Sequence, residues 1–169
     1  MWNFYHQNFF TPIDTIIIYL LYYIYNRYII YNKWGDSLLL KLDLQSEIPI
    51  YMQLKMQIIE GIATGSLVPG EPLPSVRQLA SDLGINLHTV NKAYTMLKQD
   101  GFIIIHRQKG VVVSPAEDIK VTNEYISQLK ANMRPIITEA FCRGMAIDEF
   151  NAICKEIFTE LKQTGGKIL

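Results

Sequence analysis

Hydrophobic positions between residues 48 and 113 change their spacing along the chain, and each change marks a new element. The first apolar positions recur every fourth residue, which predicts a helix that opens at Pro49 and ends near Gly65. They are Ile50, Leu54, Ile58 and Ile62. The stretch SLVPGEPLP follows, and its three prolines and one glycine predict a loop.

Two short helices are expected next. Ser75 is a suitable N-cap for the first, and Gln78 three residues later completes a capping-box pattern. Gly84 ends this helix after about eight residues. Asn86 then caps a second helix, which runs to Gly101 at its C-terminal end.

After the second short helix the apolar pattern becomes that of strands. The runs FIII and VVV are rich in β-branched residues, and HRQKG between them predicts a hairpin with a basic tip. The order helix, loop, helix, tight turn, helix, hairpin is that of a winged helix-turn-helix. We therefore predict an α+β, mostly α fold, with this domain at residues 38–115.

Helical spacing returns in the tail, residues 116–169. A long helix is expected from about Ile119 to Arg143, and a last helix is expected to follow a cap at Asp148. The apolar stripe of the long helix is wider than the last helix can cover alone. We therefore predict that the two helices form a dimerisation segment that pairs with a second copy of the chain.

The first 37 residues differ from the rest in composition. Seven of the ten tyrosines and both tryptophans lie in residues 1–34, together with many Ile and Asn. Only twelve uncharged residues separate Asp14 from Arg27, too few to cross a bilayer of about 30 Å as a helix. We favour an extension, disordered or an isolated helix, that is not part of the native protein, and a membrane-associated helix remains the alternative. A secretory signal fits poorly, because no basic segment precedes the apolar run.

The overall charge and the cysteine content say little about function, but the charge of one segment is informative. The formal net charge of the chain is zero, yet residues 75–110 carry five basic side chains against two acidic ones, a net charge of +3. Such a local excess fits a surface that faces DNA. Cys142 and Cys154 are expected to be buried thiols in a reducing cytosol, and no zinc-site spacing occurs, so no metal or cofactor is expected.

The second short helix carries the candidate chemistry. His88, Asn91, Lys92 and Thr95 share one face, and no acidic residue occurs between Asn86 and Lys98. Asparagine can pair with adenine through two hydrogen bonds, and lysine can reach guanine or a phosphate. An ordinary polar surface helix is the alternative for this face.

Other candidate contacts flank this helix. Arg77 lies one turn into the preceding helix and could meet a phosphate, or could pair with Asp82 as an ordinary surface arginine. Thr89 and Tyr94 have hydroxyls suited to phosphate contacts, although a partly buried packing role for Tyr94 stays open. Ser75, at the start of the preceding helix, is also counted among the candidate contacts.

The hairpin tip adds the last candidates. Arg107 and Lys109 would lie along or in the minor groove, and a solvated loop is the alternative for these two residues.

The segment from Ile48 to Val113 resembles the DNA-binding domain of the GntR family of bacterial regulators. The marks are G-x-L-x-P-G-x-x-L-P-S-x-R-x-L-A and T-V-x-K-A-Y-x-x-L-x-x-D-G. The short helical tail is similar to that of the YtrA-type subfamily. The resemblance implies binding as a dimer to an inverted-repeat operator.

By position, the resemblance assigns DNA contacts to Arg77, Thr89, Lys92, Tyr94 and the wing residue Gly110. The sequence departs from the family pattern at two places. Lys92 stands where arginine is frequent, and Gln108 stands where glycine is common.

We thus expect a cytoplasmic transcription regulator, most simply a repressor, that binds double-stranded operator DNA as a homodimer. A membrane-tethered regulator is the alternative. About fifty residues after Pro115 cannot hold a catalytic domain, so no enzyme activity is expected. A small-molecule effector is compatible with the chain but has no identified site.

Overall fold

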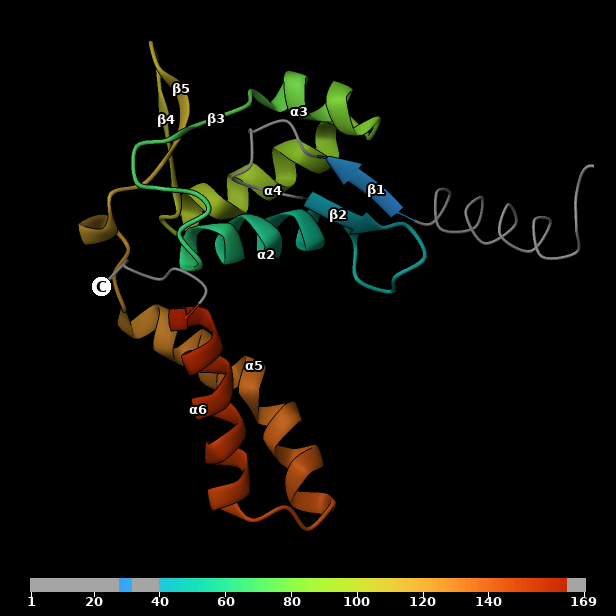
Figure 1. Cartoon of the computed structure of the whole chain (residues 1–169), viewed down its shortest axis with the longest axis vertical. Coiled ribbons are helices and arrows are strands. Elements are labelled where there is room, and N and C mark those ends of the chain that lie inside the picture. Colours follow the sequence, from blue (N-terminus) through green and yellow to red (C-terminus); the bar gives the residue numbers. More distant parts are fainter. Residues whose placement is uncertain (1–27, 32–39, 164–169) are drawn as a thin grey trace, which may run out of the picture.

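The computed structural model describes residues 28–31 and 40–163. Two strands, β1 (Tyr28–Tyr31) and β2 (Leu40–Asp43), precede the first described helix (Figure 1). The DNA-binding region then follows in the order α2 (Ile50–Ala63), β3 (Pro72–Leu73), α3 (Val76–Leu83), α4 (Leu87–Gln99), β4 (Ile103–His106) and β5 (Gly110–Val113). A short 3-10 turn (Ala116–Asp118) leads to α5 (Asn123–Cys142) and α6 (Ile147–Gln163).

The ends of α3 and α4 follow the expected capping chemistry. The Ser75 hydroxyl accepts a hydrogen bond from the Gln78 backbone N–H, and Gly84 ends α3 with φ +63°. The Asn86 side chain accepts a hydrogen bond from the His88 N–H and caps α4. The capping box is only half formed, however, because the Gln78 side chain does not accept a hydrogen bond from the Ser75 backbone N–H among the described residues, and its amide group instead donates to the Asp82 carboxylate at 2.6 Å.

The wing is a three-stranded antiparallel sheet in the order β3-β5-β4. β4 and β5 form the expected hairpin, with Ile103 opposite Val113 and His106 opposite Gly110. The third strand was not expected, since Pro72 and Leu73 pair with Val112 and Val111 inside the stretch predicted to be a loop. The prolines allow this because β3 is an edge strand, and an edge strand can lack donors on its outer side.

A second small sheet lies beside α2. β1 pairs antiparallel with β2 from Tyr28 opposite Asp43 to Tyr31 opposite Leu40. The other edge of β2 is bonded to side chains of α2, because the amides of Gln53 and Gln57 exchange hydrogen bonds with the backbone of Asp43 and Lys41. Of the predicted N-terminal extension only β1 is described, and the apolar run from 15 to 26 lies outside the described residues.

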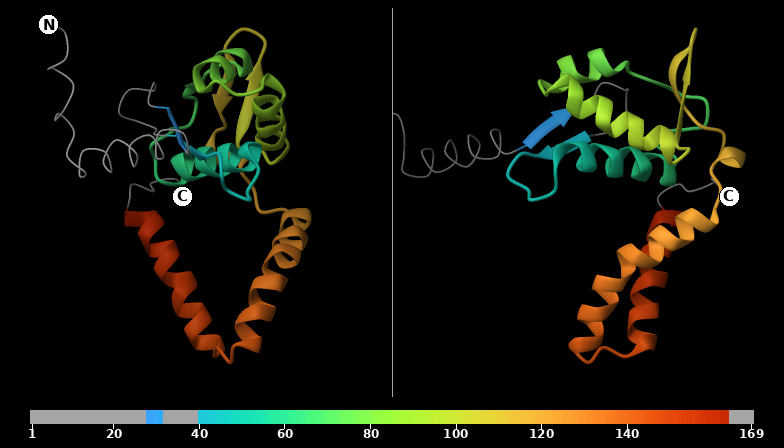
Figure 2. Two further views of the ribbon diagram at one scale, coloured as in Figure 1. Left: turned by 90° about the vertical axis from the view of Figure 1, so that its right-hand side faces the viewer. Right: turned by 180° about the vertical axis from the view of Figure 1, so that it is seen from behind.

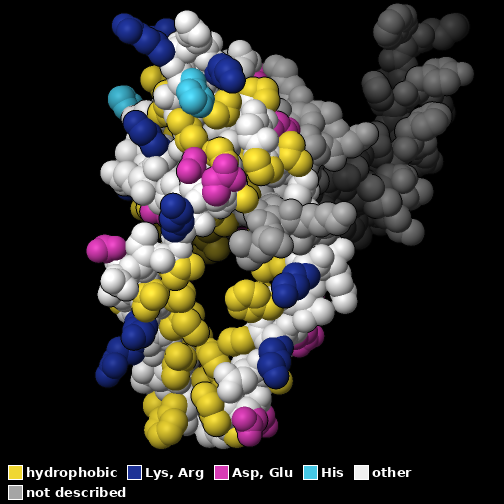
Figure 3. Space-filling view, turned by 90° about the vertical axis from the view of Figure 1, so that its left-hand side faces the viewer, with side chains coloured by type: hydrophobic (Ala, Val, Ile, Leu, Met, Phe, Trp, Pro, Cys, Tyr) yellow, Lys and Arg dark blue, Asp and Glu magenta, His cyan; other side chains and the backbone are white. Residues whose placement is uncertain are grey.

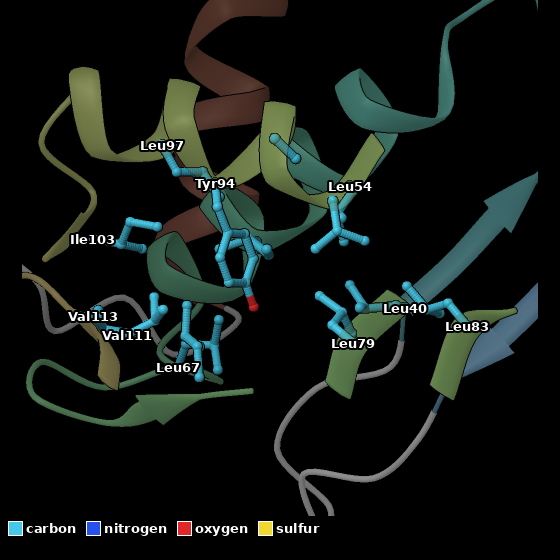
Figure 4. Packing of buried hydrophobic residues seen from close by; sticks show 14 of the residues in the cluster. Leu40, Leu54, Leu67, Leu79, Leu83, Tyr94, Leu97, Ile103, Val111 and Val113 are labelled. Carbon is cyan, nitrogen blue, oxygen red and sulfur yellow. The ribbon is translucent and has the colours of Figure 1, made fainter. Parts of the chain in front are cut away.

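One hydrophobic core joins these elements. Side chains from β2, α2, α3, α4 and the wing strands are buried in one cluster. Figure 4 shows Tyr94 of α4 among Leu67, Leu97 and Ile103 within this core. The architecture is a winged helix-turn-helix, mostly helical with a small antiparallel sheet, so the predicted fold class is confirmed.

The tail differs from this domain in burial. α5 begins at Asn123, with Thr122 as its cap, four residues later than expected, because residues 116–118 form the 3-10 turn and Ile119 packs against the core. α6 begins at Ile147, one residue before the expected cap. Neither helix contains a buried residue, and Figure 2 shows them diverging from their junction like the arms of a V.

The cysteines of the tail correct another expectation. Cys142 is exposed and Cys154 is only partly buried, and both are free thiols. The prediction of buried thiols is wrong because the helices that carry them have no core of their own.

Candidate nucleic-acid interface

Helix α4 has two distinct faces. Val90, Ala93, Tyr94 and Leu97 are buried against the core, and they recur at the spacing of one helix face. His88, Asn91, Lys92 and Thr95 are exposed on the remaining surface. The side chains predicted to read DNA are therefore brought together on one exposed face.

The start of α4 is held firmly. Gly84 adopts the left-handed conformation, which makes the sharp turn between α3 and α4, and the Asn86 carboxamide fixes the first turn of α4 through the His88 N–H at 2.8 Å. Thr89, in that first turn, is half-buried. The exposed face thus begins at a defined point relative to α3, the first helix of the helix-turn-helix.

Arg77 projects from the first turn of α3 and is exposed. Among the described residues it forms no ion pair with Asp82, whose carboxylate instead accepts from Gln78. The surface pairing considered for Arg77 is therefore not formed. Ser75, next to it, is exposed but uses its hydroxyl as the helix cap.

The tip of the wing is exposed and carries two cations. Arg107 and Lys109 lie in the turn between β4 and β5, and Gly110 closes the turn with φ +74°. No atom lies within 4 Å of where a Cβ of Gly110 would stand, so this glycine is needed for its backbone conformation and not for space. Basic side chains and histidine side chains gather over this end of the molecule in Figure 3.

Tyr94 is placed differently from the other candidates. Its side chain is 1% exposed, and its hydroxyl donates to the Pro74 carbonyl at 3.0 Å. The bond ties α4 to the segment just before α3. The packing role left open for Tyr94 is the one that this geometry supports, and a phosphate contact is not.

The acidic residues near this surface have partners within the protein. Asp100, at the end of α4, pairs with Lys55 of α2. Asp82 accepts from Gln78, as described above. The cations of α3, α4 and the wing therefore face solvent without a competing acid in the described part of the chain.

Lys92 has a partner that the sequence did not indicate. Its ammonium nitrogen lies 3.7 Å from the centre of the Tyr51 ring, which belongs to the first turn of α2. This is within the range of a cation–π interaction. Tyr51 is half-buried and packs against the core, so it presents a fixed ring.

Comparisons with known proteins agree with this geometry. The family model described as bacterial regulatory proteins, gntR family, matches residues 50–113. The HTH-type transcriptional repressor YtrA of Bacillus subtilis (strain 168) is 32% identical over 129 residues, which is 76% of this chain and 98% of the relative. The chain belongs to the GntR family.

Further relatives support the membership. The HTH-type transcriptional repressor NagR of Bacillus subtilis (strain 168) is 40% identical to this chain over 70 residues. The match covers 41% of this chain and 29% of NagR. A crystal structure described as a transcriptional antiterminator from Listeria monocytogenes EGD-e superposes with a TM-score of 0.65 at 27% identity, covering 76% of this chain and 94% of that one. The predicted likeness to the YtrA type is confirmed by the match to YtrA.

GntR membership makes this chain a DNA-binding transcription regulator and not an enzyme, as predicted. Within the described residues, no group of His, Cys, Asp and Glu side chains is arranged to hold a metal ion. Among the same residues, no helix is both long enough and apolar enough to cross a membrane.

Sequence reasoning missed Tyr51 because it considered each helix face separately. In the sequence, Tyr51 only stands next to Ile50, the first residue of the apolar stripe of that helix. The usable signal was an aromatic ring in the first turn of a helix that packs against α4, because a ring face can hold a lysine ammonium group. Only the crossing of α2 and α4 brings the ring to Lys92.

Proposed function

We propose that this GntR regulator binds operator DNA with the exposed face of α4 in the major groove. Asn91 and His88 would address base edges, and Arg77 with Thr89 would contact the sugar-phosphate backbone. Arg107 and Lys109 at the wing tip would follow the adjacent minor groove. The observation that carries the proposal is the exposed, acid-free set of His88, Asn91, Lys92 and Thr95 on α4.

We also propose that two chains pair through the tail. α5 and α6 expose Ile126, Leu129, Ile136, Ile137, Phe141, Ile153, Ile157 and Phe158. Figure 3 shows hydrophobic side chains lining both helices where they face each other. A second copy of the same chain is a suitable occupant, because its tail offers the same apolar surface and a two-fold pair presents two copies of α4 to the two halves of an inverted repeat.

The direction of regulation follows from the relatives. YtrA and NagR of Bacillus subtilis are named as transcriptional repressors, and we propose repression for this chain as well. The regulator would act in the cytoplasm, where bacterial operator DNA lies. The membrane-tethered alternative rests on residues 1–34, of which the structure describes only 28–31.

The test of DNA binding starts from the full chain. Duplexes are selected from a random-sequence library, and affinity for the selected duplex is measured as a function of salt. Arg77→Ala should weaken binding and lower the slope of log K against log salt by about one, because one phosphate contact is lost. Asn91→Ala should weaken binding to the selected duplex while leaving the slope unchanged.

Gln99→Ala is a matched control. Gln99 is exposed at the other end of α4, so its replacement should leave affinity and slope unchanged. Wild-type binding by both Arg77→Ala and Asn91→Ala would show that DNA contacts a different face.

A further inference from the structure

We propose that Tyr51 is a positioning residue of the DNA interface, which holds the Lys92 ammonium group for a contact with a DNA phosphate. The inference rests on the proposed function and names the role of one contact within it. It starts from Lys92, the cation in the first half of the exposed face of α4, and from what its ammonium group touches in the free protein.

Lys92 has few competing partners. The residues three and four positions away along α4 are His88, Thr89, Thr95 and Met96, and none of them is acidic. In the described part of the chain, Lys92 forms no ion pair with a carboxylate. Its contact is with the Tyr51 ring, 3.7 Å from the ring centre.

The ring is held more rigidly than the lysine. Tyr51 is half-buried and packs against the hydrophobic core, whereas Lys92 is exposed. A free lysine side chain loses much conformational entropy when it is fixed on an anion. A ring that already confines the ammonium group lowers that loss, and it leaves the N–H donors on the side away from the ring available to an anion.

The same contact favours phosphate over a base. The ammonium is held at the seam between α2 and α4 and is not extended freely away from α4. Lysine also lacks the planar, forked donors with which arginine grips guanine. A compact cation at a fixed place is suited to neutralising one phosphate, a contact that sets orientation and does not read sequence.

The experiment is a double-mutant cycle in the full chain. Affinity is measured for a duplex selected from a random library and for a mixed-sequence duplex of the same length. Lys92→Ala should weaken both by about five- to tenfold and lower the salt slope by about one. Tyr51→Leu should weaken both by about two- to fivefold. Tyr51→Leu should have no further effect in the Lys92→Ala background.

Two controls separate positioning from general structure. Tyr51→Phe keeps the ring face and should bind within about twofold of wild type, because the quadrupole of phenylalanine also attracts a cation. Lys98→Ala is the second control, since Lys98 lies six residues beyond Lys92 on α4, about 9 Å along the helix axis. Its effect should add to that of Tyr51→Leu.

A measurement without DNA tests the contact itself. In the free protein, the ring current of Tyr51 should shift the ε-methylene protons of Lys92 upfield in the NMR spectrum. The shift should persist in Tyr51→Phe and vanish in Tyr51→Leu.

Several results would overturn the inference. They are tighter DNA binding by Tyr51→Leu, equal losses for Tyr51→Phe and Tyr51→Leu, additive losses in the cycle, or a Lys92→Ala change confined to one base pair of the selected duplex. Each of these can occur while the wild-type chain binds DNA tightly. A wild-type chain that selects no duplex would instead overturn the proposed function, and this inference with it.

Discussion

At the scale of single residues, the position of the Tyr94 hydroxyl favours a packing role over a contact with DNA. The hydroxyl lies in the core and donates to Pro74, so it braces α4 against the start of α3. The bond is partly buried, so the Pro74 carbonyl would lose a donor that water replaces only in part.

Tyr94→Phe should therefore lower the free energy of unfolding by about 1 kcal/mol. The DNA affinity of the folded protein should stay unchanged. Urea denaturation and a salt titration of DNA binding provide the two measurements. If Tyr94→Phe instead lowers the slope of log K against log salt and leaves the free energy of unfolding unchanged, Tyr94 contacts a phosphate, as the family resemblance implied.

At the scale of elements, the side-chain amides of α2 complete the edge of β2. The Gln53 amide is buried, accepts from the Asp43 N–H at 2.8 Å, and donates to the Asp43 and Ile48 carbonyls at 2.8 and 2.7 Å. It acts as a neighbouring strand would, because it offers one acceptor and two donors to an extended backbone. Gln57 makes a similar exchange with Lys41 at a more exposed place.

Gln53→Ala should lower the free energy of unfolding by about 2 kcal/mol, because it removes three hydrogen bonds to the backbone of Asp43 and Ile48 at a partly buried place. Gln57→Ala is the matched control and should cost less than about 1 kcal/mol, since water can reach the groups it frees. Chemical denaturation of both variants measures the two losses in the free energy of unfolding. Equal losses would mean that burial does not distinguish the two amides.

Local patterns explain which elements were predictable. The helices of the DNA-binding region have their caps and apolar spacing within a few neighbouring residues, so the sequence predicted their order correctly. β2 and β3 could not be predicted this way. β2 depends on Gln53 and Gln57, ten and sixteen residues away from their partners, and β3 depends on pairing with β5 across the two helices between them.

The candidate site likewise has features that the sequence predicts and features that it does not. The exposed face of α4 follows from helical spacing, and the structure brings its predicted members together. The burial of Tyr94 and the stacking of Lys92 on Tyr51 depend on how helices cross, which no single helix reveals.

At the scale of the whole molecule, the DNA-binding region and the tail differ in how far their hydrophobic residues are buried. The hydrophobic cluster draws its buried residues from β2 to β5 and takes none from α5 or α6. The DNA-binding region therefore has its own core, whereas no apolar residue of α5 or α6 is buried within the described chain.

Ile137→Asp should shift the chain from dimer to monomer and weaken binding to the selected duplex at least about tenfold, because the charge would lie in the proposed interface between chains. Thr138→Asp is the matched control. It places the same charge one residue further, about 100° around the helix, at an exposed position whose hydroxyl bonds only to the Arg134 carbonyl.

Sedimentation at several protein concentrations measures the shift. Dimers that persist in Ile137→Asp would place the interface elsewhere. Monomers in both variants would show that any charge in α5 disrupts pairing.

The lack of burial in α5 and α6 has a consequence for the amount of protein that a cell must hold. Helices of 20 and 17 residues without tertiary support are marginally stable in water. Pairing and helix stability in the proposed dimer are therefore linked, and the stability of the tail depends on chain concentration. Chains made below the dimer dissociation constant would present an open tail to proteases. Such a regulator would be cleared when scarce and would persist once abundant, so its occupancy of DNA would rise more steeply than its rate of synthesis.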